Sequence, residues 1–273
     1  MEYKTIAKKQ KIPVLGIGTW GMGGGVMRST SNDKQDLQAL KTALKLGITH
    51  IDTAEYYGNG HAEELVGEAI KRFDRKKLFI TSKVWSTHLS YNGVIKAAEG
   101  SLRRMVLKCM DLYLIHWPNF LFPLKKTISA MDYLVDAGIT RFIGVSNFSV
   151  KQMKDAQEYS KHGIVANQVE YSLVCRKPEQ EVLPYCQENN IILTAYTPLA
   201  KGKLSQWGYN IVLDSIARKY KKTPGQVALN WLISQKNVIA IPKASKIEHI
   251  KENLGAVGWR MSTENIDRLA KEF

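Results

Sequence analysis

The feature that most constrains the fold of this chain is a regular alternation between two kinds of segment. Eight short runs of apolar residues alternate with longer stretches whose apolar residues recur at helical spacing. The runs begin at Val14, Ile48, Leu78, Asp111, Phe142, Val165, Ile191 and Val238. Strands nearly continuous in Val, Ile and Leu are typical of parallel sheets covered by helices on both faces. The sequence therefore predicts one α/β domain over residues 1–273, a (β/α)8 TIM barrel.

The segments between the apolar runs are the expected helices of the barrel. They span residues 32–46, 61–73, 91–107, 124–137, 150–161, 179–189, 209–220 and 246–254. The periodicity of the first helix places its apolar residues toward the barrel. Lys34, Asp36 and Lys41 are then expected to face water.

Three further segments complete the expected architecture. Residues 3–13 predict a short N-terminal β-hairpin around Lys8-Lys9-Gln10 that closes the bottom of the barrel, and residues 224–235 and 262–273 predict extra C-terminal helices. The rival fold is an open doubly wound sheet, which requires a glycine-rich turn leading from the first strand directly into a helix. Residues 21–25 are rich in glycine, but no helical pattern begins there, so the barrel is preferred.

Composition restricts the class of protein. No apolar run approaches the ~20 residues needed to cross a bilayer, and the first residues lack the apolar stretch of a secretory signal. Cys109, Cys175 and Cys186 are odd in number and lack CxxC spacing, which favours free thiols in the cytoplasm and no metal site. The formal charge of +14 is spread over most expected helices. It is therefore interpreted as a solvated surface that attracts an anionic cofactor, with no nucleic-acid or membrane partner and no signal for an oligomeric state.

Four polar side chains lie at or just after the ends of neighbouring predicted strands, where barrel enzymes carry their active sites. Asp52, Lys83 and His116 end the second, third and fourth strands, and Tyr57 lies in the loop after Asp52. An ammonium beside a phenol lowers the pKa of the phenol, and Asp52 would keep Lys83 charged. A neutral His116 could donate a hydrogen bond to a substrate oxygen. The set predicts that Tyr57 donates a proton to a developing alkoxide.

Each of these residues also has a structural interpretation. Tyr57 could pack in a turn, and a lone histidine such as His116 is more often a satisfied core residue. Lys83 differs, because an unpaired buried ammonium costs several kcal/mol, so that it requires Asp52 or a similar partner.

Eight segments, in order along the chain, resemble those of the aldo-keto reductases. They are 16–20 (GIGTW), 52–59 (DTAEYYGN), 81–85 (TSKVW), 114–118 (LIHWP), 144–148 (GVSNF), 167–171 (NQVEY), 195–199 (AYTPL) and 241–245 (IPKAS). The resemblance extends from the opening hairpin to about Asn253. It implies a catalytic tetrad of Asp52, Tyr57, Lys83 and His116. Tyr57 rather than Tyr56 matches, since the catalytic tyrosine lies five residues beyond the aspartate.

The resemblance also implies a nicotinamide cofactor, NADPH (NADP+), with NADH as a weaker alternative. The residues that match cofactor contacts of the family are Gly18, Thr19, Trp20, Asp52, Ser146, Asn147, Gln168, Tyr196, Thr197, Pro198, Leu199, Gly202, Ile241, Lys243, Ala244, Ser245, His249, Glu252 and Asn253. Hydroxyl and amide side chains among them suit a carboxamide, which needs both donors and acceptors. The residues that match the substrate pocket are Trp20, Tyr57, Trp85, His116 and Trp117.

Two departures from the family pattern bear on specificity. His249 stands where many NADPH-preferring members carry arginine, so that a permanent charge is replaced by one that titrates near neutrality. The chain ends at Phe273 without the long C-terminal tail that forms a specificity loop in the family. An open pocket with broad selectivity is expected.

Residues and resemblance together predict an NAD(P)H-dependent oxidoreductase. It would reduce a small-molecule carbonyl substrate (an aldehyde, ketone or dicarbonyl) to an alcohol by direct hydride transfer, and would act as an alcohol dehydrogenase in reverse. Two alternatives remain open. One is a barrel aldolase that uses Lys83 as a Schiff-base nucleophile, and the other is a cofactor-binding regulatory subunit with slow turnover.

Overall fold

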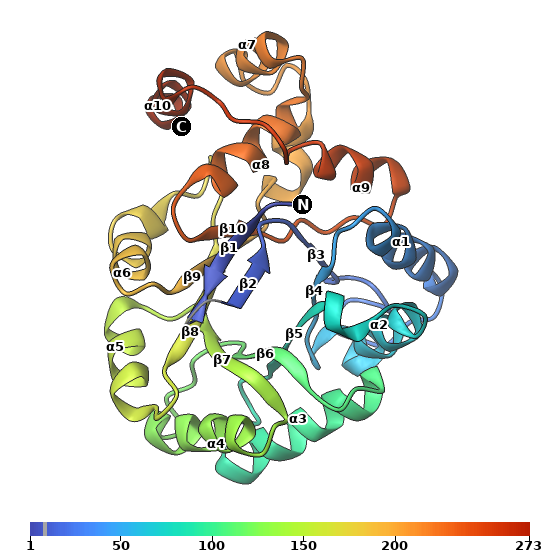
Figure 1. Ribbon diagram of the computed structural model, residues 1–273, viewed down its shortest axis with the longest axis vertical. Coiled ribbons are helices and arrows are strands. Elements are labelled where there is room, and N and C mark those ends of the chain that lie inside the picture. The colour runs from blue at the N-terminus through green and yellow to red at the C-terminus, as the bar shows by residue number, and fades with distance from the viewer. Residues whose placement is uncertain (8–9) are drawn as a thin grey trace.

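The computed structural model describes residues 1–7 and 10–273, so Lys8 and Lys9 of the predicted hairpin lie outside the described residues. Strands β1 (Tyr3–Ile6) and β2 (Gln10–Pro13) pair antiparallel, as predicted. Ile6 and Ile12 are fully buried and join an apolar cluster with inward-facing residues of the barrel strands. In Figure 1 the hairpin lies across the centre of the ring of helices, where it closes the end of the barrel opposite the strand C-termini.

Eight parallel strands form the barrel. In chain order they are β3 (Gly16–Gly18), β4 (His50–Asp52), β5 (Phe79–Val84), β6 (Met110–Ile115), β7 (Thr140–Ser146), β8 (Ile164–Glu170), β9 (Ile192–Tyr196) and β10 (Val238–Ala240). Parallel bridges join Leu15 to Ala240 and Gly18 to Lys243, which brings the last strand beside the first and closes the sheet. The predicted barrel is confirmed, and every predicted apolar run overlaps one of its strands.

The helices surround this sheet (Figure 1). They are α1 (Asp33–Lys45), α2 (His61–Ile70), α3 (Tyr91–Met105), α4 (Leu124–Asp136), α5 (Val150–Tyr159), α6 (Val182–Glu188), α7 (Ile211–Tyr220), α8 (Pro224–Ser234), α9 (Ile247–Leu254) and α10 (Thr263–Glu272). Among the described residues, none of these helices is both long enough and apolar enough to cross a membrane.

The prediction was wrong about which helix near the C-terminus belongs to the barrel. Helix α8, predicted as an extra helix, is buried along almost its whole length and packs against β10. Helix α7, predicted as a barrel helix, lies outside the ring beside α10 (Figure 1). The reason is that α8 is apolar on nearly all sides, which only a covered position tolerates, whereas α7 and α10 each have a polar face.

A second correction concerns α1. Lys34 is exposed and Lys41 is half-buried, but Asp36 is buried and does not face water. Helical periodicity placed it on the polar side, and this assignment fails because a loop and a distant segment fold over that side and hydrogen-bond the carboxylate.

Candidate active site

A cavity of about 1040 Å³ opens at the end of the barrel where the strands reach their C-termini. All of the residues predicted to bind the cofactor line it, except Ala244 and Ser245. Every residue predicted for the substrate pocket lines it as well. The structure therefore brings together the predicted site residues, which are spread over most of the chain.

The centre of the cavity floor is a buried cluster of Asp52, Lys83 and Tyr57. Adjacent strands β4 and β5 place Asp52 and Lys83 side by side, and the Lys83 Nζ–Asp52 Oδ1 distance is 2.5 Å. The same ammonium donates to the carbonyl oxygen of Thr53 at 2.9 Å and to Tyr57 Oη at 3.3 Å. Lys83 does not line the cavity, but its partners Asp52 and Tyr57 both do. Its three N–H groups all have acceptors, so the ammonium form is fully satisfied.

The charges in this cluster follow from burial and pairing. Burial raises the pKa of Tyr57, and the Lys83 ammonium only partly offsets this rise. Burial alone would lower the pKa of Lys83, but Asp52 and Tyr57 outweigh it and the net shift is upward. Lys83 lowers the pKa of Tyr57, as predicted, but the predicted net decrease was wrong, because burial has the larger effect. Tyr57 therefore holds its proton at neutral pH.

His116 lies beside Tyr57 at the wall of the cavity. The ring centroids are 5.6 Å apart and the planes meet at 74°. Burial, together with the nearby Lys83 charge, lowers the pKa of His116 to about 2, so that the ring is neutral. Its buried Nδ1 has no hydrogen-bond partner among the described residues. A neutral ring has one N–H, and a proton on Nε2 leaves the unpartnered nitrogen as an acceptor rather than as an unsatisfied donor.

Next to this cluster, a hydrogen-bonded set of amide and hydroxyl side chains ends strands β7, β8 and β9. Gln168 Nε2 donates to Asp52 Oδ2 at 2.8 Å, which leaves Gln168 Oε1 as an acceptor for a ligand. Asn147 Nδ2 donates to the carbonyl oxygen of His116 at 3.2 Å and to Ser146 Oγ at 3.0 Å. Tyr196 Oη donates to Asn147 Oδ1 at 3.0 Å, and burial raises the pKa of Tyr196 to about 12. The ring of Tyr196 is thus fixed at the cavity wall.

The loop after β9 has an unusual backbone. Thr197, Ala200 and Lys201 have φ values of 51°, 50° and 57°, in the left-handed region that favours glycine. Each such residue costs of order 1–3 kcal/mol and persists where the surroundings fix it, often at ligand sites. Lys201 faces the cavity together with Ser205 and Gln206, and none of the three was predicted. Lys201 adds a cation here, and only its place beside the predicted segment 197–199 could have indicated it.

Another part of the cavity wall carries Lys243 and His249 of the predicted cofactor site. Lys243 and His249 are exposed there and line the cavity with Asn253. Ala244 is buried and has no polar side-chain group, and the hydroxyl of Ser245 donates to Asp36 Oδ1 at 3.1 Å. The structure thus leaves Ala244 and Ser245 outside the cavity wall.

Aromatic side chains form a further part of the cavity wall. Trp20, Trp85 and Trp117 line it as predicted, and Trp20 and Trp117 are partly exposed at its rim. Tyr56, which was not predicted, lines it too and stacks on Trp85, with ring centroids 3.6 Å apart and planes within 11°. The backbone N–H of Trp85 donates to Glu55 Oε1 at 2.7 Å, which holds the loop after β5 against the loop after β4.

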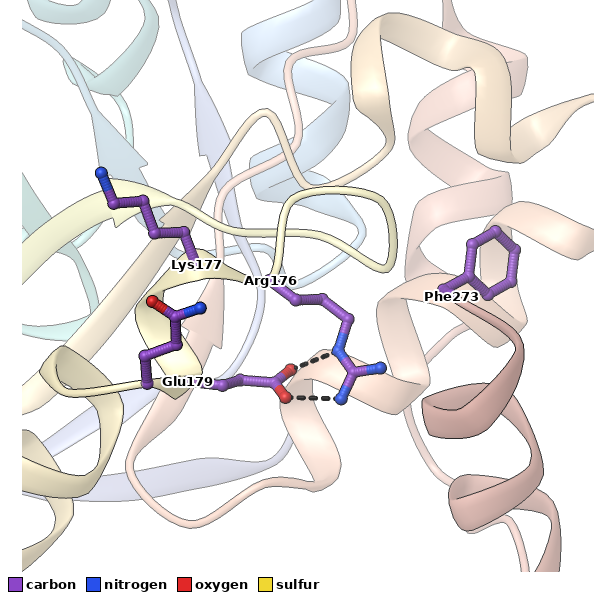
Figure 2. A pocket seen from close by; sticks show the side chains of 5 residues that line it. Arg176, Lys177, Glu179 and Phe273 are labelled. Carbon is purple, nitrogen blue, oxygen red and sulfur yellow. Dashed lines mark hydrogen bonds and ion pairs between the residues drawn. The ribbon is translucent and has the colours of Figure 1, made fainter.

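A second hollow, of about 700 Å³, lies between the loop after β8 and the C-terminus (Figure 2). Arg176, Lys177, Glu179, Gln180 and Phe273 line it. Glu179 pairs with Arg176 through two hydrogen bonds, of 2.8 and 2.5 Å, as Figure 2 shows. The guanidinium charge is therefore already matched, and the hollow shows no set of groups comparable to the barrel mouth.

Comparisons with known proteins agree with this geometry. Residues 14–271 match the model of the aldo/keto reductase family. Methylglyoxal reductase YeaE of Escherichia coli (strain K12) is 37% identical over 265 residues, which cover 96% of this chain and 91% of that protein. A thermostable aldo-keto reductase in complex with the inhibitor epalrestat has a TM-score of 0.96 and 45% identity, with full coverage of both chains. An aldo/keto reductase from Klebsiella pneumoniae in complex with NADP and acetate has a TM-score of 0.88 and 35% identity, covering 97% and 93% of the two chains.

Proposed function

Because the chain belongs to the aldo/keto reductase family, we propose that it is an NADPH-dependent reductase of small aldehydes and ketones, dicarbonyls included. The observation that carries the proposal is the chain of contacts from Asp52 through Lys83 to Tyr57, which ends in the cavity beside a neutral His116. The name of the Escherichia coli relative supports methylglyoxal as one substrate to test. Oxidation of an alcohol is the same path reversed.

In the proposed mechanism, each residue acts on the carbonyl oxygen or on Tyr57. His116 donates a hydrogen bond that orients the oxygen, and Tyr57 Oη transfers its proton to that oxygen as negative charge develops. Lys83 then stabilises the tyrosinate, and Asp52 keeps Lys83 charged and in place. When bound, the nicotinamide supplies the hydride that the carbonyl carbon receives.

The cavity has groups that suit a nicotinamide dinucleotide along its length. We propose that Gln168, with Ser146 and Asn147, binds the carboxamide and that Tyr196 lies against the nicotinamide ring. Lys243 and His249 would bind the phosphate at the adenosine end of NADPH. The Klebsiella pneumoniae neighbour, which was solved with NADP, supports this choice of cofactor. NADH is the weaker alternative, since it lacks the phosphate.

The contacts of Lys83 argue against the aldolase alternative. A Schiff-base lysine must be a neutral amine with access to the substrate carbonyl. The pKa of Lys83 is instead raised by Asp52 and Tyr57 against the effect of burial, and its nitrogen does not face the cavity. The regulatory-subunit alternative differs in turnover rather than in contacts, and a rate measurement decides it.

The direct test is coenzyme oxidation, measured with NADPH and NADH across a panel of carbonyl compounds. The panel should include methylglyoxal, small aliphatic aldehydes, simple ketones and benzaldehyde. We expect NADPH-dependent turnover with several of these and a loss of activity in Tyr57→Phe. Coenzyme binding without turnover on any carbonyl would favour the regulatory subunit and overturn the proposal.

We also propose a cytoplasmic location for the enzyme. Its three cysteines, Cys109, Cys175 and Cys186, are all free thiols in the structure, and burial raises the pKa of each. Such thiols suit a reducing compartment. Fractionation of cells expressing the chain tests this proposal.

A further inference from the structure

Asp36 is a buried carboxylate outside the catalytic cluster. It lies in the first turn of α1 and is 3% exposed. Its Oδ2 accepts the backbone N–H of Gly23 at 3.2 Å, and its Oδ1 accepts the hydroxyl of Ser245 at 3.1 Å. These partners lie 13 and 209 positions away in the sequence, so that one side chain joins two segments that are far apart in the sequence.

The two joined segments both lead to the cavity wall. Gly23 follows Trp20 and Gly21, which line the cavity. Ser245 follows Lys243, which lines the cavity at the position proposed for the phosphate. A few residues earlier the backbones of the two segments already pair, so the carboxylate adds a second link behind the cavity wall without lining the cavity itself.

The loop around Gly23 is held at a few points. Gly23 has a φ of +66°, and a Cβ there would lie 2.9 Å from the ring of His61, so the backbone passes close to α2. Met22 is buried in the core, and the Gly58 N–H donates to the carbonyl oxygen of Gly25 at 2.7 Å, but residues 25–30 are exposed. A segment with few buried contacts depends on the hydrogen bonds that it makes. The Gly23 bond to Asp36 is a buried one.

The segment around Ser245 is attached to the same turn of α1. Besides the bond to Asp36, Gln35 Nε2 donates to the carbonyl oxygen of Ser245 at 3.3 Å. A displacement of either segment would therefore disturb the same first turn of α1. Removing the Ser245 hydroxyl would leave a buried carboxylate oxygen without its donor. A buried polar atom without a partner lowers the free energy of unfolding, unless the surrounding segments move to give it one.

We propose that Asp36 is a positioning residue that links two parts of the cavity wall, so that the loop bearing Trp20 is held in place partly by the segment bearing Lys243. This inference rests on the proposed function, since it assigns the coenzyme phosphate to the wall at Lys243 and the carbonyl substrate to the wall at Trp20. A change at Ser245 alters the wall around Trp20, although Ser245 itself does not line the cavity.

The test compares Ser245→Ala and Asp36→Ala with variants that keep the hydrogen bonds. The first measurement needs no activity: amide hydrogen exchange in peptides covering residues 20–30 of the purified protein. We expect faster exchange there in Ser245→Ala, and still faster exchange in Asp36→Ala. Ser245→Thr keeps the hydroxyl, and Asp36→Asn keeps an acceptor for Gly23 and offers a donor to Ser245, so both should behave like the wild type. Glu248→Gln removes an exposed carboxylate nearby and serves as the control.

The second measurement is the ratio of the KM for benzaldehyde to the KM for a two-carbon aldehyde at saturating coenzyme. Loss of one hydrogen bond predicts a rise in this ratio of roughly 3- to 10-fold in Ser245→Ala. A purely structural role would lower thermal stability and leave the ratio unchanged. Unchanged exchange in residues 20–30, an unchanged ratio in Ser245→Ala, or an Asp36→Asn variant equal to Asp36→Ala each overturns the inference. If the wild type reduces no carbonyl compound, the proposed function fails, and the exchange measurement still decides the role of Asp36.

Discussion

The substitution Lys83→Met tests both the mechanism and the electrostatics of the buried cluster. Methionine preserves the apolar stem of the side chain and removes the ammonium. Of its hydrogen bonds to described residues, the side chain of Asp52, 2% exposed, would then keep only the one from Gln168. Removing one partner of a buried ion pair typically costs about 3–5 kcal/mol, because the other charge stays behind without compensation. We expect the free energy of unfolding, measured in urea at pH 7, to fall by about this amount.

The same substitution should change catalysis through the pKa of Tyr57. Burial already raises this pKa, and Lys83 is the group that opposes the rise. A neighbouring ammonium lowers a phenol pKa by roughly 1–3 units, which corresponds to about 1.4–4 kcal/mol. Its loss makes tyrosinate formation harder by that amount, so turnover should fall by roughly 10- to 10³-fold. In alcohol oxidation, where Tyr57 must accept a proton, the pH of half-maximal rate should move upward by about the same number of units.

Two comparisons separate these effects. Lys76→Met removes an exposed lysine and should change stability by less than about 0.5 kcal/mol. The double variant Asp52→Asn/Lys83→Met leaves no stranded charge and should regain part of the lost stability without regaining activity. An oxidation pH profile of Lys83→Met that matches the wild type would refute the role of Lys83 in setting the acidity of Tyr57.

Further predictions concern the acid, the pocket, the coenzyme and the barrel interior. Tyr57→Phe should lower turnover by roughly 10²–10⁴-fold with coenzyme affinity retained; near wild-type turnover would exclude it as the acid. Trp85→Ala should raise the KM for benzaldehyde more than that for a two-carbon aldehyde, and equal changes would argue against a wall role. His249→Arg should tighten NADPH binding, measured by tryptophan fluorescence, by about 10-fold at pH 8 and leave NADH binding unchanged; an unchanged NADPH affinity would contradict this. Burial lowers the pKa of His50 to about 4, below its value in the unfolded chain, so stability should fall by up to about 3 kcal/mol as pH drops from about 6.5 to 4, and less in His50→Gln; equal losses would count against the assignment.

The sequence was most informative where local pattern and strand order act together. The apolar runs marked every strand because a strand covered on both faces needs apolar residues throughout. Strand order then placed Asp52 and Lys83 on neighbouring strands, and the structure brings them into contact. The family resemblance extended this to residues on later strands, such as Gln168, whose amide reaches Asp52 across the barrel.

The residues that were missed depend on contacts that local pattern does not contain. Asp36 has the spacing of a surface residue, and its burial is decided by Ser245, 209 positions later. Tyr56 was set aside because its neighbour matched the catalytic position. It lies in the cavity wall because its ring stacks on that of Trp85, in the loop after β5. Helix α8 was misplaced for a different reason: its periodicity identified a helix, but its lack of a polar face, which separates it from α7, was not used.

Burial alone accounts for much of the protonation pattern that the proposed chemistry requires. A buried phenol and a buried imidazole both favour their neutral forms, which keeps the proton on Tyr57 and prevents His116 from carrying a charge. A buried ammonium would favour its neutral form too, and the carboxylate 2.5 Å away, with a smaller contribution from Tyr57, keeps Lys83 charged. Asp52 is therefore the residue that allows one ion pair to exist in the cluster beside two neutral groups. We expect Asp52→Asn to reduce the fraction of Lys83 that is charged, and Lys83 then stabilises the tyrosinate less. The pH of half-maximal alcohol oxidation in Asp52→Asn should therefore move upward, as in Lys83→Met, although by less.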